Sequence, residues 1–468
     1  MKTKLTASIL MLLVLVPLTL VACDSLPGSG TPTHPVSTAP LIDISPSGNL
    51  AAAGGFDNLF DEIVVADESL YGTDYLGHPD SVLLDNGDIL TAFPLGHGKG
   101  ETEMVISHDG GLTWENIFDE DNPKPSSFSD TQETPTLYKL DFTDGTQKLV
   151  CISGRPSWPT VLGSVGEGFD VTVSESLDEN GSCDGLVWSE HENFYGPNAV
   201  REEYKRFAGT WDVVVGMSSL TQLKDDDGNY IDKWMGTFHD DRTFVVYKTY
   251  LTFDEDGTMD WSEPERLLGD ELEWREYERR FFGGGAFCEV EIIRSPDGGE
   301  LAALFRVNNK NSHSFVSFST DEGETWSEPQ TVSAELTGER HKAEYDPATG
   351  KLVITFRSVY YKNTVGGSWY SKGWVAWIGD YDDLKTGAAG DAVVKLAHTY
   401  GDSDAAGTEA NSDTGYAGLV IYPDGLVVTC SYGTFSPADD PTHGGDTFIV
   451  AKRFTLRELV RCSGVTIG

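Results

Sequence analysis

Two arginines occupy the same position in two repeated segments of the sequence. Arg306 follows the apolar segment 301–305, and Arg357 follows the matching segment 352–356. A guanidinium group is planar, stays charged and binds a carboxylate through two parallel hydrogen bonds. The two side chains therefore predict a pocket that binds an anionic group. A salt bridge between neighbouring repeats, with a purely structural role, is the alternative.

A His-Asp-Asp run follows a third segment of this kind. His239 and Asp240 come directly after the apolar residues 234–238, where a strand is expected to end. A histidine and an aspartate placed in a pocket bind hydroxyl groups or donate a proton. In a chain with so many acidic residues, a solvated loop is the alternative.

A six-fold repeat must position these groups. In each copy a turn with a glycine precedes an alternating apolar segment, which is typical of a β-hairpin. The turn glycines are Gly87, Gly145, Gly228, Gly298, Gly350 and Gly425. Each unit spans about 67 residues, enough for one four-stranded antiparallel sheet. The sequence therefore predicts an all-β fold, a six-bladed β-propeller over residues 56–468, with a polar pocket where the innermost strands end.

A second repeat indicates the kind of blade. Residues 107–114 and 319–326 both read S-x-D-x-G-x-T-W, and a degenerate copy runs from Phe253 to Trp261. The Ser and Asp side chains are expected to bond to the turn backbone, while glycine supplies a positive φ and tryptophan packs between blades. The motif resembles the Asp-box, or BNR repeat. Nearly everything after residue 55 resembles the bacterial sialidase-like glycoside hydrolases.

This resemblance implies a role for the arginines. Sialidases hold the carboxylate of their substrate with three arginines, and Arg306 and Arg357 look like two of them. The first blade of a sialidase opens with an aromatic-Arg-Ile-Pro motif, whereas residues 76–80 here read Leu-Gly-His-Pro-Asp. The first arginine is therefore absent. His78, or Arg340 together with His341, is expected to supply part of its charge.

The resemblance also implies a nucleophile and its base. Sialidases use a tyrosine activated by a glutamate, which avoids repulsion with an anionic substrate. Tyr416, ahead of the turn at 423–425, matches the nucleophile, and Asp413 just before it is expected to contact the substrate. Glu289, ahead of the turn at 296–298, matches the base. Alternatively, Tyr416 packs against a sugar ring and Glu289 pairs with an arginine.

The general acid/base is expected in the loop after the first repeated segment. Sialidases carry an aspartate in this loop, and residues 96–103 here contain Glu101 and Glu103. Asp240, at the end of its own strand, is the other candidate for this role.

These features lead to one interpretation and two alternatives. We interpret the chain as a secreted exo-glycoside hydrolase that releases a terminal, sialic-acid-like acidic sugar with retention of configuration. One alternative is an exo-glycosidase of the same fold with a different sugar specificity. The other is a non-catalytic surface propeller that binds glycans. In each case the expected partner is a glycan or oligosaccharide.

Composition argues against other partners and against cofactors. The chain has 33 Lys and Arg against 75 Asp and Glu, a net charge of −42, and no basic run. Such a chain repels phosphate backbones, so nucleic acid is excluded as a partner. The sequence holds no phosphate-binding glycine loop, no closely spaced histidine pair and no C-x-x-C pair, so we expect no cofactor and no metal.

The N-terminus predicts export and a lipid anchor. Residues 1–22 have the layout of a lipoprotein signal peptide, because lysines precede an apolar run that ends in Leu-Val-Ala-Cys. Cys23 is the expected lipidation site, and residues 23–55 are expected to form a disordered tether. The propeller would then lie outside the cytoplasm, at the cell surface or in the periplasm. An uncleaved apolar anchor is the alternative.

Overall fold

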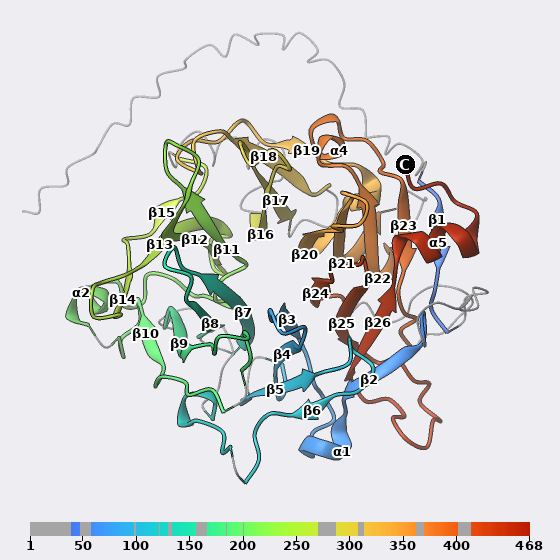
Figure 1. Ribbon diagram of the computed structural model, residues 1–468, viewed down its shortest axis with the longest axis horizontal. Helices are drawn as coiled ribbons and strands as arrows, with labels where there is room; N and C mark the ends of the chain where they lie inside the picture. The colour runs from blue at the N-terminus through green and yellow to red at the C-terminus, as the bar shows by residue number, and fades with distance from the viewer. Residues whose placement is uncertain are drawn as a thin grey trace, which may run out of the picture. The chain divides into compact units, whose positions relative to one another are not determined.

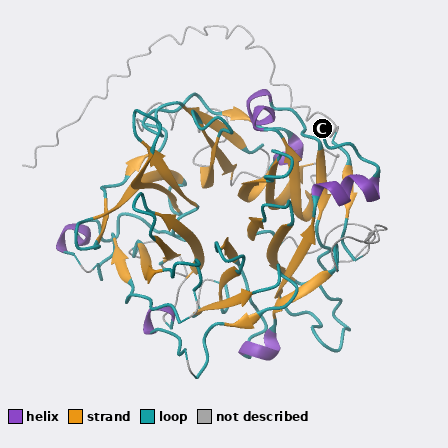
Figure 2. Ribbon diagram, in the orientation of Figure 1, coloured by secondary structure: helices purple, strands orange, loops and turns teal. Residues whose placement is uncertain are grey.

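Six small antiparallel sheets form a ring, the six-bladed β-propeller predicted from the sequence (Figure 1). The computed structural model describes residues 39–46, 58–97, 100–120, 122–129, 133–155, 166–183, 185–199, 201–269, 287–307, 313–361, 369–400 and 413–468. Strands dominate, and short helices lie towards the outer edge of the ring (Figure 2). The prediction of an all-β propeller is confirmed. The predicted signal peptide, residues 1–22, and Cys23 lie outside the described residues.

The blades follow one another along the chain, and the first strand of each lies nearest the axis (Figure 1). Blade one is β3 (Asp80–Leu83), β4 (Ile89–Pro94), β5 (Thr102–Ser107) and β6 (Glu115–Asn116). Blade two is β7 (Glu133–Asp141), β8 (Gln147–Gly154), β9 (Phe169–Ser176) and β10 (Glu192–Phe194). Blade three is β11 (Ser219–Lys224), β12 (Tyr230–Asp240), β13 (Val245–Phe253) and β14 (Met259–Trp261), with β15 (Glu265–Arg266) also paired to β13.

The second half of the ring has the same order. Blade four is β16 (Phe287–Arg294), β17 (Leu301–Val307), β18 (Phe315–Ser319) and β19 (Gln330–Thr331). Blade five is β20 (Gly338–Tyr345), β21 (Leu352–Tyr361), β22 (Trp369–Gly379) and β23 (Ala392–Lys395). Blade six is β24 (Ala417–Ile421), β25 (Val427–Gly433) and β26 (Phe448–Phe454). The described helices are α1 (Glu68–Tyr71), α2 (Glu202–Lys205), α4 (Tyr381–Thr386) and α5 (Leu456–Ser463), with 3-10 turns at Ser126–Phe128 and Ala334–Leu336.

Strands from before blade one complete the last two blades. β2 (Glu62–Ala66) pairs antiparallel with β26 and closes the ring. β1 (Leu41–Asp43) pairs in parallel with β23, so that Ile42 lies opposite Val394. The prediction that residues 23–55 form a disordered tether is therefore wrong for residues 41–43. The reason is burial, since Ile42 and Ile44 are both only 2% exposed and pack into the core.

The repeated glycines connect the first and second strands. All six have φ between 76° and 94°, a conformation that favours glycine because a Cβ is strained there. At the last of these turns the Gly425 amide donates to the carbonyl of Tyr422 over 2.9 Å. The apolar segments after the glycines form β4, β8, β12, β17, β21 and β25. The sequence repeat is therefore a hairpin repeat.

The two S-x-D-x-G-x-T-W turns follow third strands and have matching hydrogen bonds. In the first, Ser107 donates to Asp109 over 2.9 Å, and the Thr113 hydroxyl donates to Asp109 over 2.7 Å. In the second, Ser319 and Thr325 donate to Asp321 over 2.7 and 2.5 Å. These turns lie away from the axis and shape the blade edges. No helix in the described part of the chain is long and apolar enough to cross a membrane.

Candidate active site

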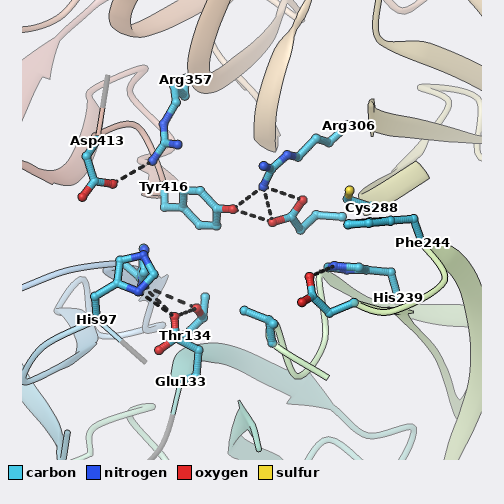
Figure 3. Close-up of a pocket in the computed structure, with 14 residues that line it drawn as sticks. His97, Glu133, Thr134, His239, Phe244, Cys288, Arg306, Arg357, Asp413 and Tyr416 are labelled. Atoms are coloured by element: carbon cyan, nitrogen blue, oxygen red, sulfur yellow. Dashed lines mark hydrogen bonds and ion pairs between the residues drawn. The ribbon is translucent and has the colours of Figure 1, made fainter. Parts of the chain in front are cut away.

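One mouth of the propeller gathers polar side chains from every blade. Antiparallel pairing places the start of each first strand beside the end of the second strand. A pocket of about 200 Å³ opens there. Its described lining is His78, His97, Glu133, Thr134, Val214, His239, Asp241, Phe244, Cys288, Glu289, Arg306, Arg357, Asp413 and Tyr416 (Figure 3).

Tyr416, Glu289 and Arg306 form a connected group in this pocket. The Tyr416 hydroxyl donates to Glu289 Oε1 over 2.5 Å. Arg306 Nη1 donates to both Glu289 oxygens, over 2.8 and 3.0 Å, and to the Tyr416 hydroxyl over 2.5 Å. Tyr416 and Glu289 are buried, at 9% and 4% exposed. Blades four and six thus bring together residues that are far apart in the chain.

Burial and charge set the protonation of this pair. Burial by itself would raise the pKa of Glu289, but the Arg306 charge, helped by His239 and the Tyr416 hydroxyl, lowers this pKa to about 2. Burial, opposed by Arg306 but reinforced by the Glu289 charge, raises the pKa of Tyr416 well above its ordinary value. Near neutral pH the pair is therefore a phenol that donates to a carboxylate.

Arg357 is held entirely by protein acceptors. Its Nη1 donates to Glu339 over 2.9 Å, and its Nη2 donates to Asp413 over 3.2 Å and to the Tyr432 hydroxyl over 2.8 Å. Its Nε donates to the carbonyl of Thr414 over 2.5 Å. The three guanidinium nitrogens therefore all have partners. Asp413 lines the pocket and also accepts from Tyr432 over 2.7 Å.

Glu339 lies between the two arginines. It is 3.5 Å from Arg306 Nη2 and accepts from Arg357 Nη1. The arginines predicted to share a site therefore do so, although their described ion pairs are with carboxylates of the protein.

Irregularities in three first strands direct carboxylates towards this mouth. The register shifts between Glu133 and Thr136 in β7, between Phe287 and Val290 in β16, and between Glu339 and Lys342 in β20. A β-bulge re-aims the side chains beside it and is common next to active sites. Each of the three bulges falls at or next to a glutamate of the site, namely Glu133, Glu289 and Glu339.

His78 lines the pocket beside Tyr416 and Tyr432, but it does not carry the charge expected from the sequence. Its ring centroid is 4.9 Å from that of Tyr416 and 4.8 Å from that of Tyr432. Burial, with a smaller effect from His97, lowers the pKa of His78 to about 3. The imidazole is therefore neutral near pH 7. It does not replace the charge of the missing arginine.

The two neighbouring aspartates after His239 point in different directions. His239 and Asp241 line the pocket, with His239 Nε2 4.0 Å from Asp241 Oδ1. Asp240, which the sequence singled out, does not line it. The Asp240 carboxylate accepts from the amide of Asp212 over 2.8 Å and from Thr243 over 2.7 Å. Strand alternation explains the difference, since successive side chains project to opposite faces.

The acid/base candidates from the first blade lie outside the pocket. Glu101 and Glu103 both pair with Lys124, Glu103 at 2.5 Å. They lie beside or in β5, the third strand of its blade and therefore farther from the axis than β3 and β4.

The second cation candidate also lies elsewhere. Arg340 Nη1 donates to the carbonyl of Ser218 over 2.7 Å, and His341 Nε2 lies 3.0 Å from the carbonyl oxygen of Leu336. Neither Arg340 nor His341 lines the described pocket.

Sequence reasoning missed His97, Glu133 and Thr134 and did not choose Asp241 over its neighbour. None of these residues belongs to a recognised motif. Glu133 nevertheless begins the first strand of its blade, as Glu289 stands near the start of another. An alignment of the starts of the first strands would have pointed to it.

Comparison with known proteins supports the fold assignment. No protein-family model matches this chain, and no curated protein matches it. A protein of unknown function from Dyadobacter fermentans aligns over 84% of this chain and 97% of its own, with 17% identity and a TM-score of 0.52. The intramolecular trans-sialidase from Ruminococcus gnavus, in complex with oseltamivir carboxylate, aligns over 86% and 99%, with 13% identity and a TM-score of 0.51.

A third solved structure carries a different activity. The α-L-arabinofuranosidase from Fusarium graminearum, in complex with an iminosugar inhibitor, aligns over 86% of this chain and 99% of its own, with 12% identity and a TM-score of 0.50. The chain therefore has the sialidase-like six-bladed propeller fold. The same fold serves a trans-sialidase and an arabinofuranosidase, so the sugar has to be argued from the site.

Proposed function

We propose that this protein is an exo-acting glycoside hydrolase that releases a terminal sugar from a glycan with retention of configuration. The observation that carries the proposal is the 2.5 Å contact between the Tyr416 hydroxyl and Glu289, with Arg306 donating to both. A phenol becomes a nucleophile when a base at hydrogen-bond distance takes its proton. A propeller that only binds glycans needs no such buried pair.

The proposed reaction has two displacements at the anomeric carbon. In the first, the Tyr416 oxygen bonds to this carbon, the phenolic proton passes to Glu289, and the bond to the leaving oxygen breaks. A general acid gives that oxygen its proton. In the second, water attacks the carbon, its proton goes to the conjugate base of the acid, and Tyr416 leaves and recovers its proton from Glu289. Two inversions give net retention.

Arg306 supports this chemistry from its position. Its Nη1 is within 2.5 Å of the Tyr416 oxygen, on which negative charge develops as the proton leaves. A fixed cation there stabilises the phenolate more than the neutral phenol. This role differs from the clamp on a substrate carboxylate that the sequence predicted for Arg306.

We propose Asp241 as the general acid/base. It lines the pocket, and its side chain is 25% exposed, which leaves it accessible to substrate and water. Burial raises its pKa, with Asp212 and Glu289 acting in the same direction against His239. A carboxyl group whose pKa is raised gives its proton to the leaving oxygen more readily than it would hold a charge in this pocket, which suits a general acid. Asp413 is less suited, because the hydrogen bond from Tyr432 and the Arg357 charge outweigh burial and lower its pKa.

The contacts of the arginines favour a neutral terminal sugar. All three nitrogens of Arg357 and the Nη1 of Arg306 have protein acceptors. In the described lining, two guanidinium groups face the carboxylates of Glu133, Glu289 and Asp413, in addition to the proposed acid Asp241. A carboxylated sugar would enter this pocket against repulsion.

The acidic sugar predicted from the sequence remains the second candidate. One observation favours it. Arg306 Nε is buried and has no hydrogen-bond partner among the described residues, so it has a donor for a substrate oxygen.

A panel of aryl glycosides tests the proposal and separates the two candidates. The purified protein is incubated with a sialoside, uronides, neutral hexopyranosides and arabinofuranosides, and early product is examined by proton NMR. We expect retained configuration and faster cleavage of a neutral sugar. Faster cleavage of the sialoside or a uronide would establish the acidic sugar. Inversion would overturn the role of Tyr416, and binding to glycans without any cleavage would establish the non-catalytic alternative.

We also propose that the protein is a lipoprotein that works outside the cytoplasm. The support comes from the sequence, where Lys2 and Lys4, the apolar run and Cys23 have the order of a lipoprotein signal. Export and lipid attachment would place the catalytic domain next to extracellular or periplasmic glycans.

A further inference from the structure

Two histidines and a glutamate converge beside Tyr416 on one wall of the pocket. His78 precedes β3, His97 follows β4 and Glu133 begins β7, so two neighbouring blades supply them. One candidate ligand atom from each lies within 4.8 Å of the others. Glu133 Oε1 is 3.4 Å from His78 Nδ1 and 3.9 Å from His97 Nδ1. Figure 3 shows His97 and Glu133 across the pocket from Arg306.

The backbone is strained at His78 and at Thr134, the residue next to Glu133. His78 and Thr134 both have φ of 45°, which is rare for residues other than glycine and exceptional for a β-branched threonine. The bulge in β7 directs Glu133, whose Oε1 accepts from the Thr134 hydroxyl over 3.1 Å. His78 and Glu133 are 4% and 1% exposed. Strain of this kind persists where surrounding structure enforces it, and it concentrates at ligand sites.

The charge balance of the pocket favours a cation at this wall. In the described lining, the carboxylates of Glu133, Glu289 and Asp413 face two guanidinium groups, and the proposed acid Asp241 is a fourth carboxyl group. The two arginines lie on the other side and form ion pairs with Glu289, Glu339 and Asp413. A dication beside Glu133 would offset the excess of negative charge.

We propose that His78, His97 and Glu133 bind a divalent transition-metal cation, of which Zn²⁺ is the representative. Two imidazoles and one carboxylate form a donor set that zinc uses in catalytic sites, where a further position stays open. Calcium and magnesium prefer oxygen ligands alone. Zinc ligands lie about 2.0–2.1 Å from the metal, so the three side chains must close slightly. The His97 side chain is 49% exposed and is able to make this movement.

This inference goes beyond the sequence, which contains no closely spaced histidine pair. The ligands are collected from positions 78, 97 and 133, and only the ring of blades brings them together. The open position would face the space next to Tyr416, where a hydroxyl group of the bound sugar is a suitable oxygen ligand. The cation would thus help to orient the substrate.

Direct metal binding tests the inference without any assay of activity. The full-length chain, prepared without a histidine tag and freed of metal with a chelator, is titrated with ZnCl₂ in a calorimeter. We expect one equivalent of Zn²⁺ to bind. His97→Ala and Glu133→Gln should each weaken this binding at least about 10-fold, which is the lower end of the loss when groups that support a metal are removed. Co²⁺ should give visible absorption bands in the native chain that both variants lose.

A matched control separates this site from a surface histidine near carboxylates. The His108 side chain is 47% exposed and lies 2.8 Å from Asp88 and 3.4 Å from Glu115, so it resembles His97 in exposure and surroundings. His108→Ala should bind Zn²⁺ like the native chain. Unchanged binding in His97→Ala and Glu133→Gln, loss of binding in His108→Ala, or no binding by the native chain would each overturn the proposal. His97→Ala decides alone if Glu133→Gln lowers the melting temperature.

Discussion

Glu289 and Glu291 lie two residues apart on β16 and line different cavities. Glu289 borders the candidate active site, whereas Glu291 borders a second cavity of about 720 Å³, lined largely by the other ends of the first strands. Burial is the largest influence on both pKa values. For Glu289, the charge of Arg306 outweighs the effect of burial, and the pKa is about 2. For Glu291, the charges of Lys342 and Arg340 do not outweigh burial, and the pKa is raised to about 7.

This difference predicts a pH dependence of stability at Glu291. Its pKa is raised from 4.5 to about 7 in the folded state, so ionisation costs more there than in the unfolded chain. The neutral Glu291 carboxyl makes its full contribution to the free energy of unfolding below pH 4.5, and this contribution is lost as the pH rises through 7. We expect Glu291→Gln to remove this loss, which amounts to at most about 3 kcal/mol. The measurement is the free energy of unfolding in urea at pH 5 and pH 8. An equal gap between variant and native protein at both pH values would contradict it.

A double-mutant cycle tests the pair formed by Tyr416 and Glu289. Tyr416→Phe removes one oxygen and keeps the ring, and Glu289→Gln keeps the size of the side chain. Because the two groups act as a unit, each variant should lower kcat on the order of 10³-fold or more, and the double variant should be scarcely worse than either. Steady-state kinetics on the best aryl glycoside provide the measurement. Full activity in Tyr416→Phe would remove tyrosine from the mechanism.

Neighbouring aspartates provide a matched test of the acid/base. Asp241→Asn should abolish the alkaline limb of the pH profile of kcat/KM. It should slow the cleavage of substrates with poor leaving groups most, because their leaving oxygen needs a proton from the general acid. Asp240→Asn should instead weaken the contacts to Asp212 and Thr243 and lower the free energy of unfolding by about 1–3 kcal/mol. The reverse pattern, with a lost pH limb in Asp240→Asn, would restore the assignment made from the sequence.

Lipid attachment is tested at Cys23. Cys23→Ser should block processing of the N-terminus or release the protein from membranes, while the propeller keeps its melting temperature. Fractionation of cells and mass spectrometry of the N-terminal peptide are the measurements. Retention of Cys23→Ser on membranes at the native level would favour the uncleaved apolar anchor.

The fold was predictable because its signal is local and repeated. A positive-φ glycine before an alternating apolar segment is readable at Gly87 as well as at Gly425, and both form the expected turn. Strand β1 was not predicted because Ile42 and Ile44 stand among residues typical of linkers. Their pairing with β23 depends on a surface that forms far along the chain.

The site was predictable where spacing is regular. His78, Glu289 and Tyr416 each stand nine residues before a turn glycine, and all three line the pocket. Glu133 stands twelve residues before Gly145, so it does not share this spacing. Asp240 was chosen over Asp241 because a sequence does not define a strand end to one residue, and one residue reverses the direction of the side chain.

Closure of the ring by β2 and β26 also sets the order in which the site forms during synthesis. The ribosome makes β2 before blade one, but its partner strand, Phe448–Phe454, comes near the end of the chain. Until that strand emerges, blade six has only β24 and β25, and the ring that places Tyr416 opposite Glu289 is not closed. A nascent or truncated chain that stops before residue 448 should therefore contain both Tyr416 and Glu289 but lack the closed ring that keeps them in contact. Proteases would meet an open ring rather than a completed pocket.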